Sequence, residues 1–465
     1  MNHDELNHWS KRAADWARDY HASLRDQPVR PNLGPGEFRA RIEGPAPEHP
    51  EPIDRIFKDF TRLVPDAMTH WQHPRFFAYF PANAAPVSML AEQLANAMAA
   101  QAMLWQTAPA ANEMEALTID WLRDALGLPG DLTGTIHDSA TTATLSAVLT
   151  MREQALGHDG LTRGLAGGPV LRLYASAQTH SSVDKAVRLA GIGQDNLVKV
   201  PGLEGHETFS MDPEALDSLI EQDKLAGVKP AGVVLCTGGT SIGACDLIGA
   251  CIDVAHAHGL PVHVDAAWAG SAMICPEFRL LWAGIEKADS VVFNPHKWLG
   301  AQFDCAVQFL RDPRPQIATL GLRPHYLETQ GADEVVNYNE WTVPLGRRFR
   351  ALKIWFLIRA EGLSGLRSRI RNHVSWAQEA CDAIAALPGF RITTDPILSL
   401  FTFRFHDDAR TAALLERVNN DGRIYLTQTT HEGSFVIRVQ VGQFDCTRED
   451  VMMIPTVLKD LSGDL

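Results

Sequence analysis

Six short apolar runs that alternate with helical patterns limit most strongly what this chain can fold into. The runs are Val170–Ser176, Leu197–Val200, Gly232–Cys236, Val262–Ala266, Val291–Asn294 and Ala306–Leu310. Between most of them, apolar residues recur with helical spacing, at Val183–Ala190, Pro213–Ala226 and Ile248–His258. Strands that are apolar along their whole length are buried on both faces, and their alternation with helices is typical of parallel sheets. The sequence therefore predicts an α/β domain with a mostly parallel sheet.

The segments on either side of this pattern have a different character. Residues 1–20 have a helical pattern, and residues 28–52 form a connector with many Pro and Gly residues. After residue 352, a long helical pattern precedes alternating strands such as "FVIRVQV". We predict a helical and extended N-terminal segment over residues 1–85, a large domain over 86–351 and a small α+β domain over 352–465.

Composition narrows the classes of partner. The formal net charge is −14 and no basic patch is present, so we expect neither nucleic acid nor an anionic membrane as a partner. The 7 cysteines are scattered without a C-x-x-C pair, which indicates free thiols in a reducing compartment. No uninterrupted apolar run reaches transmembrane length, and the N-terminus lacks an apolar signal region. We therefore expect a cytoplasmic protein that acts on a small molecule.

One lysine stands at an unusual place. In "SVVFNPHKWLG" an apolar strand ends at Asn294, a proline follows, and then come His296 and Lys297. An ammonium group beside a core strand loses solvation unless it is paired or has reacted. Lys297 is therefore either a side chain that extends to solvent or the attachment point of a covalent cofactor.

A carboxylate follows another strand. In "GLPVHVDAAWAG" the strand ends at Asp265, and four of the next five residues are Ala or Gly. Ligands of open α/β sheets bind at the carboxyl ends of strands, and small residues there leave room for a flat ring. The alternative is that Asp265 only caps the following helix.

Two further motifs precede helical patterns. In "HDSATTATLSAVL" Ser139, Thr141 and Thr142 open a helical run, where hydroxyls and free amides can bind an anion or simply form a cap. In "QTHSSVDKA" His180 lies between a predicted strand and a predicted helix. The glycine patterns of dinucleotide-binding and P-loop proteins are absent. A lysine, a carboxylate, an anion site and a ring-stacking group together are what pyridoxal phosphate (PLP) requires.

Longer stretches of the sequence resemble a known family. The chain resembles the group II PLP-dependent decarboxylases and, within them, the aromatic-L-amino-acid decarboxylases. The matching stretches are "HPRFFAYFPA", "SATTATL", "HSSVDKA", "HVDAAWAGSA", "CPEFR", "ADSVVFNPHKWLG", "FDC" and "PLGRRFRALKIWF". The resemblance implies an aspartate-aminotransferase-like PLP fold of type I. It also implies a homodimer with the active site at the interface, in which residues 1–85 contribute to dimerisation.

The resemblance implies the reaction and its catalytic residues. An aromatic L-amino acid (tryptophan, 5-hydroxytryptophan, dopa, tyrosine or phenylalanine) would lose CO2 to give the arylalkylamine. Lys297 would carry the cofactor, Asp265 would pair with its ring nitrogen, and His180 would stack on its ring. Tyr326, in "RPHYLET", matches the family's loop tyrosine, which protonates the product carbon. The remaining cofactor-binding residues would be Ser139, Ala140, Thr141, Thr240, Ala267, Asn294 and His296.

The resemblance also implies a substrate pocket. Its residues would be Trp71, Tyr79, Phe80, Pro81, Ala82, His180, Gly346 and, from the partner chain, Met103. Gly346 leaves room for a bulky ring, because relatives carry Gly or the larger Ser at this place. Ala82 lacks the hydroxyl of the animal dopa enzymes, which removes a hydrogen-bond partner for a catechol.

Other functions compete with this one. Relatives with Phe in place of the loop tyrosine make aldehydes by oxidative deamination, whereas Tyr326 favours the amine. A metal-dependent hydrolase would use His256, His258, His263 and Asp265, although residues two apart on a helix do not face the same way. A catalytically silent dimer that binds a partner is a third alternative, which no substitution in the sequence supports.

Overall fold

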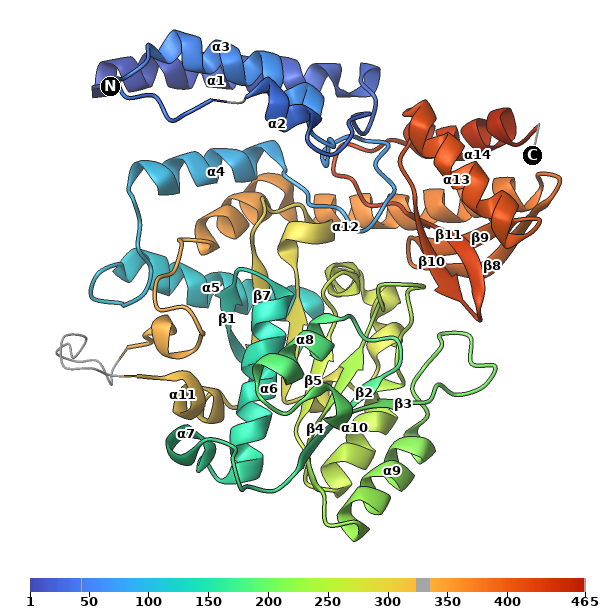
Figure 1. The fold of residues 1–465 in the computed structure, drawn as a ribbon. Coiled ribbons are helices and arrows are strands. Elements are labelled where there is room, and N and C mark those ends of the chain that lie inside the picture. The colour runs from blue at the N-terminus through green and yellow to red at the C-terminus, as the bar shows by residue number, and fades with distance from the viewer. Residues whose placement is uncertain (43, 323–334, 464–465) are drawn as a thin grey trace.

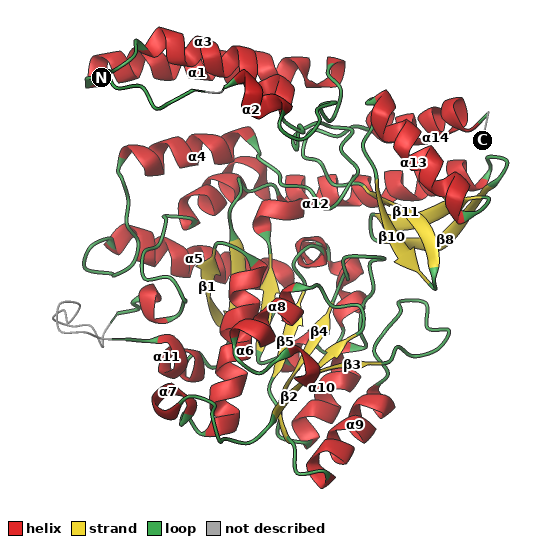
Figure 2. Cartoon of the chain, viewed as in Figure 1, coloured by secondary structure: helices red, strands yellow, loops and turns green. Residues whose placement is uncertain are grey.

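The computed structural model of the protein describes all residues except 43, 323–334 and 464–465 (Figure 1). The described chain forms an N-terminal layer of helices, a large sheet with helices on both faces and a smaller sheet covered by helices (Figure 2). None of the helices in the described ranges is both long enough and apolar enough to cross a bilayer.

The large sheet is mostly parallel, as predicted. Its order is β1-β7-β6-β5-β4-β2-β3, and every pairing among β2 to β6 is parallel. β7 runs antiparallel to both β6 and β1. The strands are β1 (Thr133–His137), β2 (Leu171–Ser176), β3 (Leu197–Val200), β4 (Lys229–Cys236), β5 (Val262–Asp265), β6 (Ser290–Phe293) and β7 (Ala306–Leu310). The six predicted strands are confirmed, whereas β1 was not predicted from the sequence.

Both faces of this sheet are covered by helices. In β4, Val233 and Leu235 pack into one hydrophobic core, and Val234, between them, packs into another. This alternation follows from the two-residue period of a strand. The helices of the large domain are α4 (Pro86–Ala97), α5 (Pro109–Leu126), α6 (Ala140–Leu156), α7 (Gly160–Arg163), α8 (Ser182–Leu189), α9 (Pro213–Leu225), α10 (Ile248–Ala257) and α11 (Arg314–Leu320). The large domain therefore has three layers, with the sheet between two layers of helices.

The N-terminal helices lie over α4 on one side of the molecule (Figure 1). They are α1 (His3–Ser23), α2 (Glu37–Arg41) and α3 (Ile53–Leu63). α1 begins with a capping box, in which the Asn2 side chain accepts backbone N–H groups and the Glu5 side chain accepts the Asn2 N–H. Three large apolar side chains are exposed on α4 and at its C-cap: Leu90 (48%), Leu94 (44%) and, at the C-cap, Met98 (60%).

The small domain is an antiparallel sheet with helices. Its order is β10-β11-β9-β8, and its elements are β8 (Phe390–Ile397), β9 (Leu400–Phe405), α13 (Asp408–Asp421), β10 (Thr427–His431), β11 (Ser434–Gln440) and α14 (Arg448–Ser462). The long helix α12 (Ala351–Ala385) connects it to the large domain and is interrupted at Gly362, where φ is 64°. Ile370 packs into the core of the large domain and Ala377 into the core of the small one. The predicted domain boundary at 351/352 stays a prediction. Along α12, the buried side chains pass from the core of the large domain to the core of the small domain between Ile370 and Ala377.

Candidate active site at the carboxyl edge of the large sheet

Residues that follow neighbouring parallel strands meet at one edge of the large sheet. His180 follows β2, Thr240 follows β4, Asp265 ends β5 and Lys297 follows β6. Because parallel strands end at the same edge, these distant residues enclose a common space. We call this space the inner cavity; its volume is about 260 Å3. It is lined by Phe80, Ser139, Ala140, Thr141, His180, Cys236, Gly238, Gly239, Thr240, Asp265, Ala267, Trp268, Asn294, His296 and Lys297.

Lys297 lies in a π-helical turn, Pro295–Leu299, directly after β6. Its N–H donates to the Asn294 carbonyl (2.9 Å), and its carbonyl accepts the Asn83 side-chain amide (2.8 Å). Its ammonium lies 5.0 Å from the centroid of the Phe80 ring and forms no ion pair with any residue that the structure describes. Burial, partly opposed by the charge of Asp265, lowers the pKa of Lys297 to about 8. More of this amine is therefore an uncharged nucleophile near neutral pH than of a surface lysine.

Asp265 is buried and held by the backbone that follows it. Its Oδ1 accepts the N–H of Ala267 at 2.9 Å. The carbonyl of Ala267 in turn accepts the N–H of Asn294 (2.8 Å), which fixes the end of β5 beside the end of β6. The other carboxylate oxygen has no hydrogen-bond partner among the described residues, so it is free to contact a ligand.

His180 is held as a neutral imidazole. Its Nδ1 accepts the N–H of Ser182 at 3.1 Å, so the ring proton resides on Nε2. Partial burial, opposed by the charge of Asp265, lowers the pKa of His180 below its usual value. A neutral ring stacks on a flat ligand without introducing a second buried cation beside Lys297.

The start of α6 has the donors that an anion-binding site would need. Ser139 is the N-cap, and its Oγ accepts the N–H of Thr142 at 3.2 Å. The first amides of a helix have no partner within the helix and favour negative charge. Asn294 is buried in the cavity wall, and its Oδ1 has no partner among the described residues. PLP fits this arrangement, because its aldehyde, ring nitrogen and phosphate match the amine, the carboxylate and the helix start.

A larger space adjoins the inner cavity. We call it the outer cavity; its volume is about 750 Å3, and it shares Phe80, His180, Thr240, His296 and Lys297 with the inner one. The rings of Trp71 and Tyr79 in its wall are stacked, with centroids 5.8 Å apart. Its other residues are Gln72, Pro81, Ala82, Ser241, Gln302, Phe303, Thr427, Gln428, Thr429 and Arg438. The space is wide enough and apolar enough for an aromatic side chain.

Arg438 is a residue of the outer cavity that the sequence reasoning missed. It is 4% exposed, and among the described residues it forms no ion pair and its Nε and Nη2 have no hydrogen-bond partner. Its Nη1 donates to the carbonyl of Tyr79 at 2.8 Å. Burial lowers its pKa to about 10. A buried guanidinium with unused donors is a site for a carboxylate. The arginine in the apolar strand "FVIRVQV" was the available signal.

Comparison with known proteins decides the family. The model of the pyridoxal-dependent decarboxylase conserved domain matches residues 35–406. The chain belongs to this family. It is 36% identical over 464 residues to the aromatic-L-amino-acid decarboxylase of Sus scrofa (97% of this chain, 93% of that protein). It is 34% identical over 461 residues to the phenylacetaldehyde synthase of Arabidopsis thaliana (95% and 92%).

Solved structures agree with this assignment. The crystal structure of Oryza sativa TDC with PLP and tryptamine superposes with a TM-score of 0.96 at 34% identity, covering 100% of this chain and 99% of that one. As a pyridoxal-dependent decarboxylase, the protein is a carboxy-lyase that uses PLP, and its large and small domains have the expected fold. These predictions are confirmed.

The structure places most predicted site residues in the decarboxylase's cavities. All ten predicted cofactor-binding residues line the inner cavity, and Trp71, Tyr79, Phe80, Pro81 and Ala82 line the outer one. Met103 and Gly346 line neither. Instead, the segments that contain them lie side by side. The residues next to Met103 bond the residue next to Gly346: the Gln101 side chain accepts the Arg347 N–H (2.7 Å), and the Ala102 N–H donates to the Arg347 carbonyl (2.8 Å). Tyr326 lies outside the described residues.

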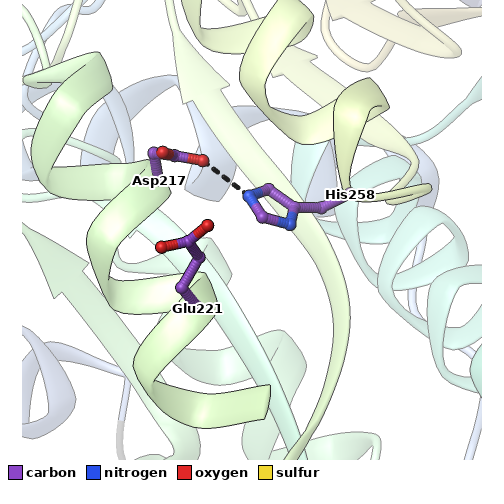
Figure 3. Close-up of side chains that lie close together, drawn as sticks. All are labelled: Asp217, Glu221 and His258. Atoms are coloured by element: carbon purple, nitrogen blue, oxygen red, sulfur yellow. Dashed lines mark hydrogen bonds and ion pairs between the residues drawn. The ribbon is translucent and has the colours of Figure 1, made fainter. Parts of the chain in front are cut away.

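The residues of the metal-hydrolase hypothesis are far from forming one site. His256 pairs with Asp289 (3.0 Å), and the buried His263 bonds Ser290 (2.9 Å). Among the described residues, one group has metal-ligand atoms within 4.8 Å of one another: Asp217, Glu221 and His258 (Figure 3). There, Nε2 of His258 already bonds Asp217 (2.6 Å), and the Lys224 ammonium lies 2.8 Å from Nδ1. The positive charge of Lys224 would repel a metal cation, so the metal-hydrolase hypothesis gains no support.

Proposed function

We propose that the protein removes CO2 from an aromatic L-amino acid and releases the arylalkylamine. The observation that carries this proposal is the outer cavity, where aromatic rings form the wall and Arg438 and Lys297 form the polar end. Aromatic-L-amino-acid decarboxylase and tryptophan decarboxylase among the relatives support the same substrate class. Release of CO2 from a panel of the twenty amino acids plus hydroxylated aromatics tests it. Turnover confined to acidic or aliphatic amino acids would contradict it.

Each residue of the inner cavity has a separate task in this proposal. PLP, when bound, provides a pyridine ring that accepts the electron pair released with CO2. The Lys297 amine would hold the cofactor, because it is a buried amine with a lowered pKa at the cavity wall. The Asp265 carboxylate holds a proton on the ring nitrogen, because its negative charge stabilises the protonated ring. His180 and Ala267, which both line the inner cavity, would pack against the faces of the ring.

Arg438 binds the substrate carboxylate in this proposal. Its two unused donor nitrogens face no carboxylate of the described chain, although the guanidinium is buried. A carboxylate held there fixes the orientation of the bond that breaks. The same side chain holds the carbonyl of Tyr79, whose backbone is in the left-handed region with φ of 46°.

Replacement of Arg438 by methionine separates these two roles. We expect kcat/KM to fall about a hundredfold, because a charge-assisted contact to the substrate is lost. The product amine has no carboxylate, so its inhibition constant should stay unchanged. Arg438→Lys, which keeps the charge, should lose less. If Arg438→Met weakens amine inhibition as much as it weakens turnover, Arg438 serves only to hold Tyr79.

Tyr326 decides between amine and aldehyde in this proposal. A phenol near the carbon that lost CO2 speeds its protonation by roughly a hundredfold or more, at the expense of attack by oxygen. We therefore expect Tyr326→Phe to shift the product from amine to aldehyde, with ammonia and hydrogen peroxide. Amine, aldehyde and peroxide should be measured together in air for both proteins. Amine alone at full rate from the variant would transfer the role of proton donor to His180.

The surface and the cysteines support two further proposals. We propose a homodimer with Met103 of each chain in the partner's substrate pocket, since Leu90 and Leu94 on α4 and Met98 at its C-cap are exposed apolar side chains. Gly346 lies beside the segment that contains Met103, because Arg347 is hydrogen-bonded to Gln101 and Ala102, and Gly346 would reach the partner's pocket in the same way. We also propose a cytoplasmic location, because the 7 cysteines are all free and buried.

A further inference from the structure

Four rings form a continuous series from the cavity wall into the core. Phe80 stacks on Trp268 (centroids 4.9 Å apart, 26° between planes), and Trp268 stacks on Trp298 (5.2 Å, 16°). The planes of Trp298 and His373 differ by 8°, with centroids 6.4 Å apart. Phe80 and Trp268 line the inner cavity, whereas Trp298 and His373 are fully buried. We call this series the aromatic stack; it connects the cavity with helix α12.

A hydrogen bond closes the buried end of the aromatic stack. Nε1 of Trp298 donates to Nδ1 of His373 at 2.9 Å. Because an indole nitrogen only donates, Nδ1 of His373 is unprotonated and its proton resides on Nε2. Burial lowers the pKa of His373 to about 3, so the ring is neutral. Its Nε2 has no hydrogen-bond partner among the residues that the structure describes.

An unpaired buried N–H destabilises the fold, and an apolar side chain of similar size would avoid that cost. What distinguishes histidine at position 373 is therefore the acceptor that it offers to Trp298. Its ring makes no other hydrogen bond to the described residues.

The aromatic stack reaches Lys297 from two directions. Trp298 is the next residue in the π-helical turn, so its side chain helps to fix the backbone that carries the lysine. Phe80, the first ring of the stack, lies 5.0 Å from the lysine ammonium. A rotation of Trp298 would therefore disturb both the start of the lysine side chain and the surface against which its end rests.

We propose that His373 is a positioning residue for Lys297: by accepting the Trp298 N–H it fixes the aromatic stack that holds the lysine amine at the inner cavity. The inference rests on the proposed role of Lys297. His373 touches neither cofactor nor substrate. Its loss should therefore weaken cofactor binding and change the environment of Trp298, rather than remove a chemical step.

The test compares three variants as cofactor-free proteins titrated with PLP. His373→Leu removes the acceptor and Trp298→Phe removes the donor, and each should raise the PLP dissociation constant roughly tenfold. The double variant should be no worse than the worse single one, because both remove the same bond. His373→Asn, which offers an acceptor near the position of Nδ1, should bind PLP almost as wild type does. Tryptophan emission of the cofactor-free protein should change in His373→Leu, and the change should vanish in the Trp298→Phe background.

Ile370→Val is the matched control. Ile370 is buried on α12 one turn from His373, so the variant lowers the melting temperature without touching the hydrogen bond. It should bind PLP normally. Wild-type PLP affinity in His373→Leu, or additive losses in the double variant, would overturn the proposal. If His373→Leu does not fold, normal affinity in Trp298→Phe overturns it equally. Absence of borohydride labelling on Lys297 in wild type would instead refute the role of Lys297.

Discussion

Lys297→Ala is expected to abolish turnover and leave the fold intact. The substitution removes both the amine that binds the cofactor and its proton transfers, so activity should fall at least about a thousandfold. It also removes a buried cation that forms no ion pair with a described residue and whose loss of solvation outweighs its attraction to Asp265, so the melting temperature should not fall. Activity, melting temperature and bound cofactor should be measured on the same preparation.

Borohydride provides the direct readout for this variant. Reduction of the wild-type holoenzyme should fix the cofactor on the peptide that contains Lys297, and the variant should show no label there. Lys185→Ala is the matched control, since Lys185 is exposed on α8. Labelling of a different lysine in wild type would show that the turn after β6 does not carry the cofactor.

Asp265→Asn is expected to lower the rate by about a hundredfold or more, which corresponds to ~3 kcal/mol for a charge-assisted contact. Asparagine still has an Oδ1 that can accept the N–H of Ala267, so the local backbone should persist. What is lost is the charge that holds a proton on the ring nitrogen. The variant therefore separates the electrostatic role of Asp265 from its role in the turn.

A second readout of Asp265→Asn uses the cofactor-free protein. The carboxylate raises the pKa of Lys297 against the effect of burial, so its removal should move that pKa further below about 8. Reaction of the Lys297 amine with an aldehyde probe across pH measures this change. Wild-type turnover together with an unchanged pH profile would show that Asp265 is only a cap.

The strands could be predicted because their burial on two faces requires apolar residues throughout. The same local reasoning placed Asp265 and Lys297 at strand ends, and parallel order then implied that they meet. β1 escaped prediction because "TGTIH" has a glycine and polar residues; its burial comes from pairing with β7. A strand whose neighbours supply the burial carries little signal in its own sequence.

The sequence by itself determined the fold class and the family, along with the residues that follow each parallel strand, because those features depend on short-range patterns and exact motifs. Only the tertiary structure decided which groups are left without partners. Arg438 comes from the small domain, and its unused donors become visible only when β11 packs against Tyr79. His373 is likewise an ordinary helical residue until α12 brings its Nδ1 to the indole beside Lys297. Burial and hydrogen-bond satisfaction are properties of packed neighbours that lie far apart along the chain, so no local pattern specifies them.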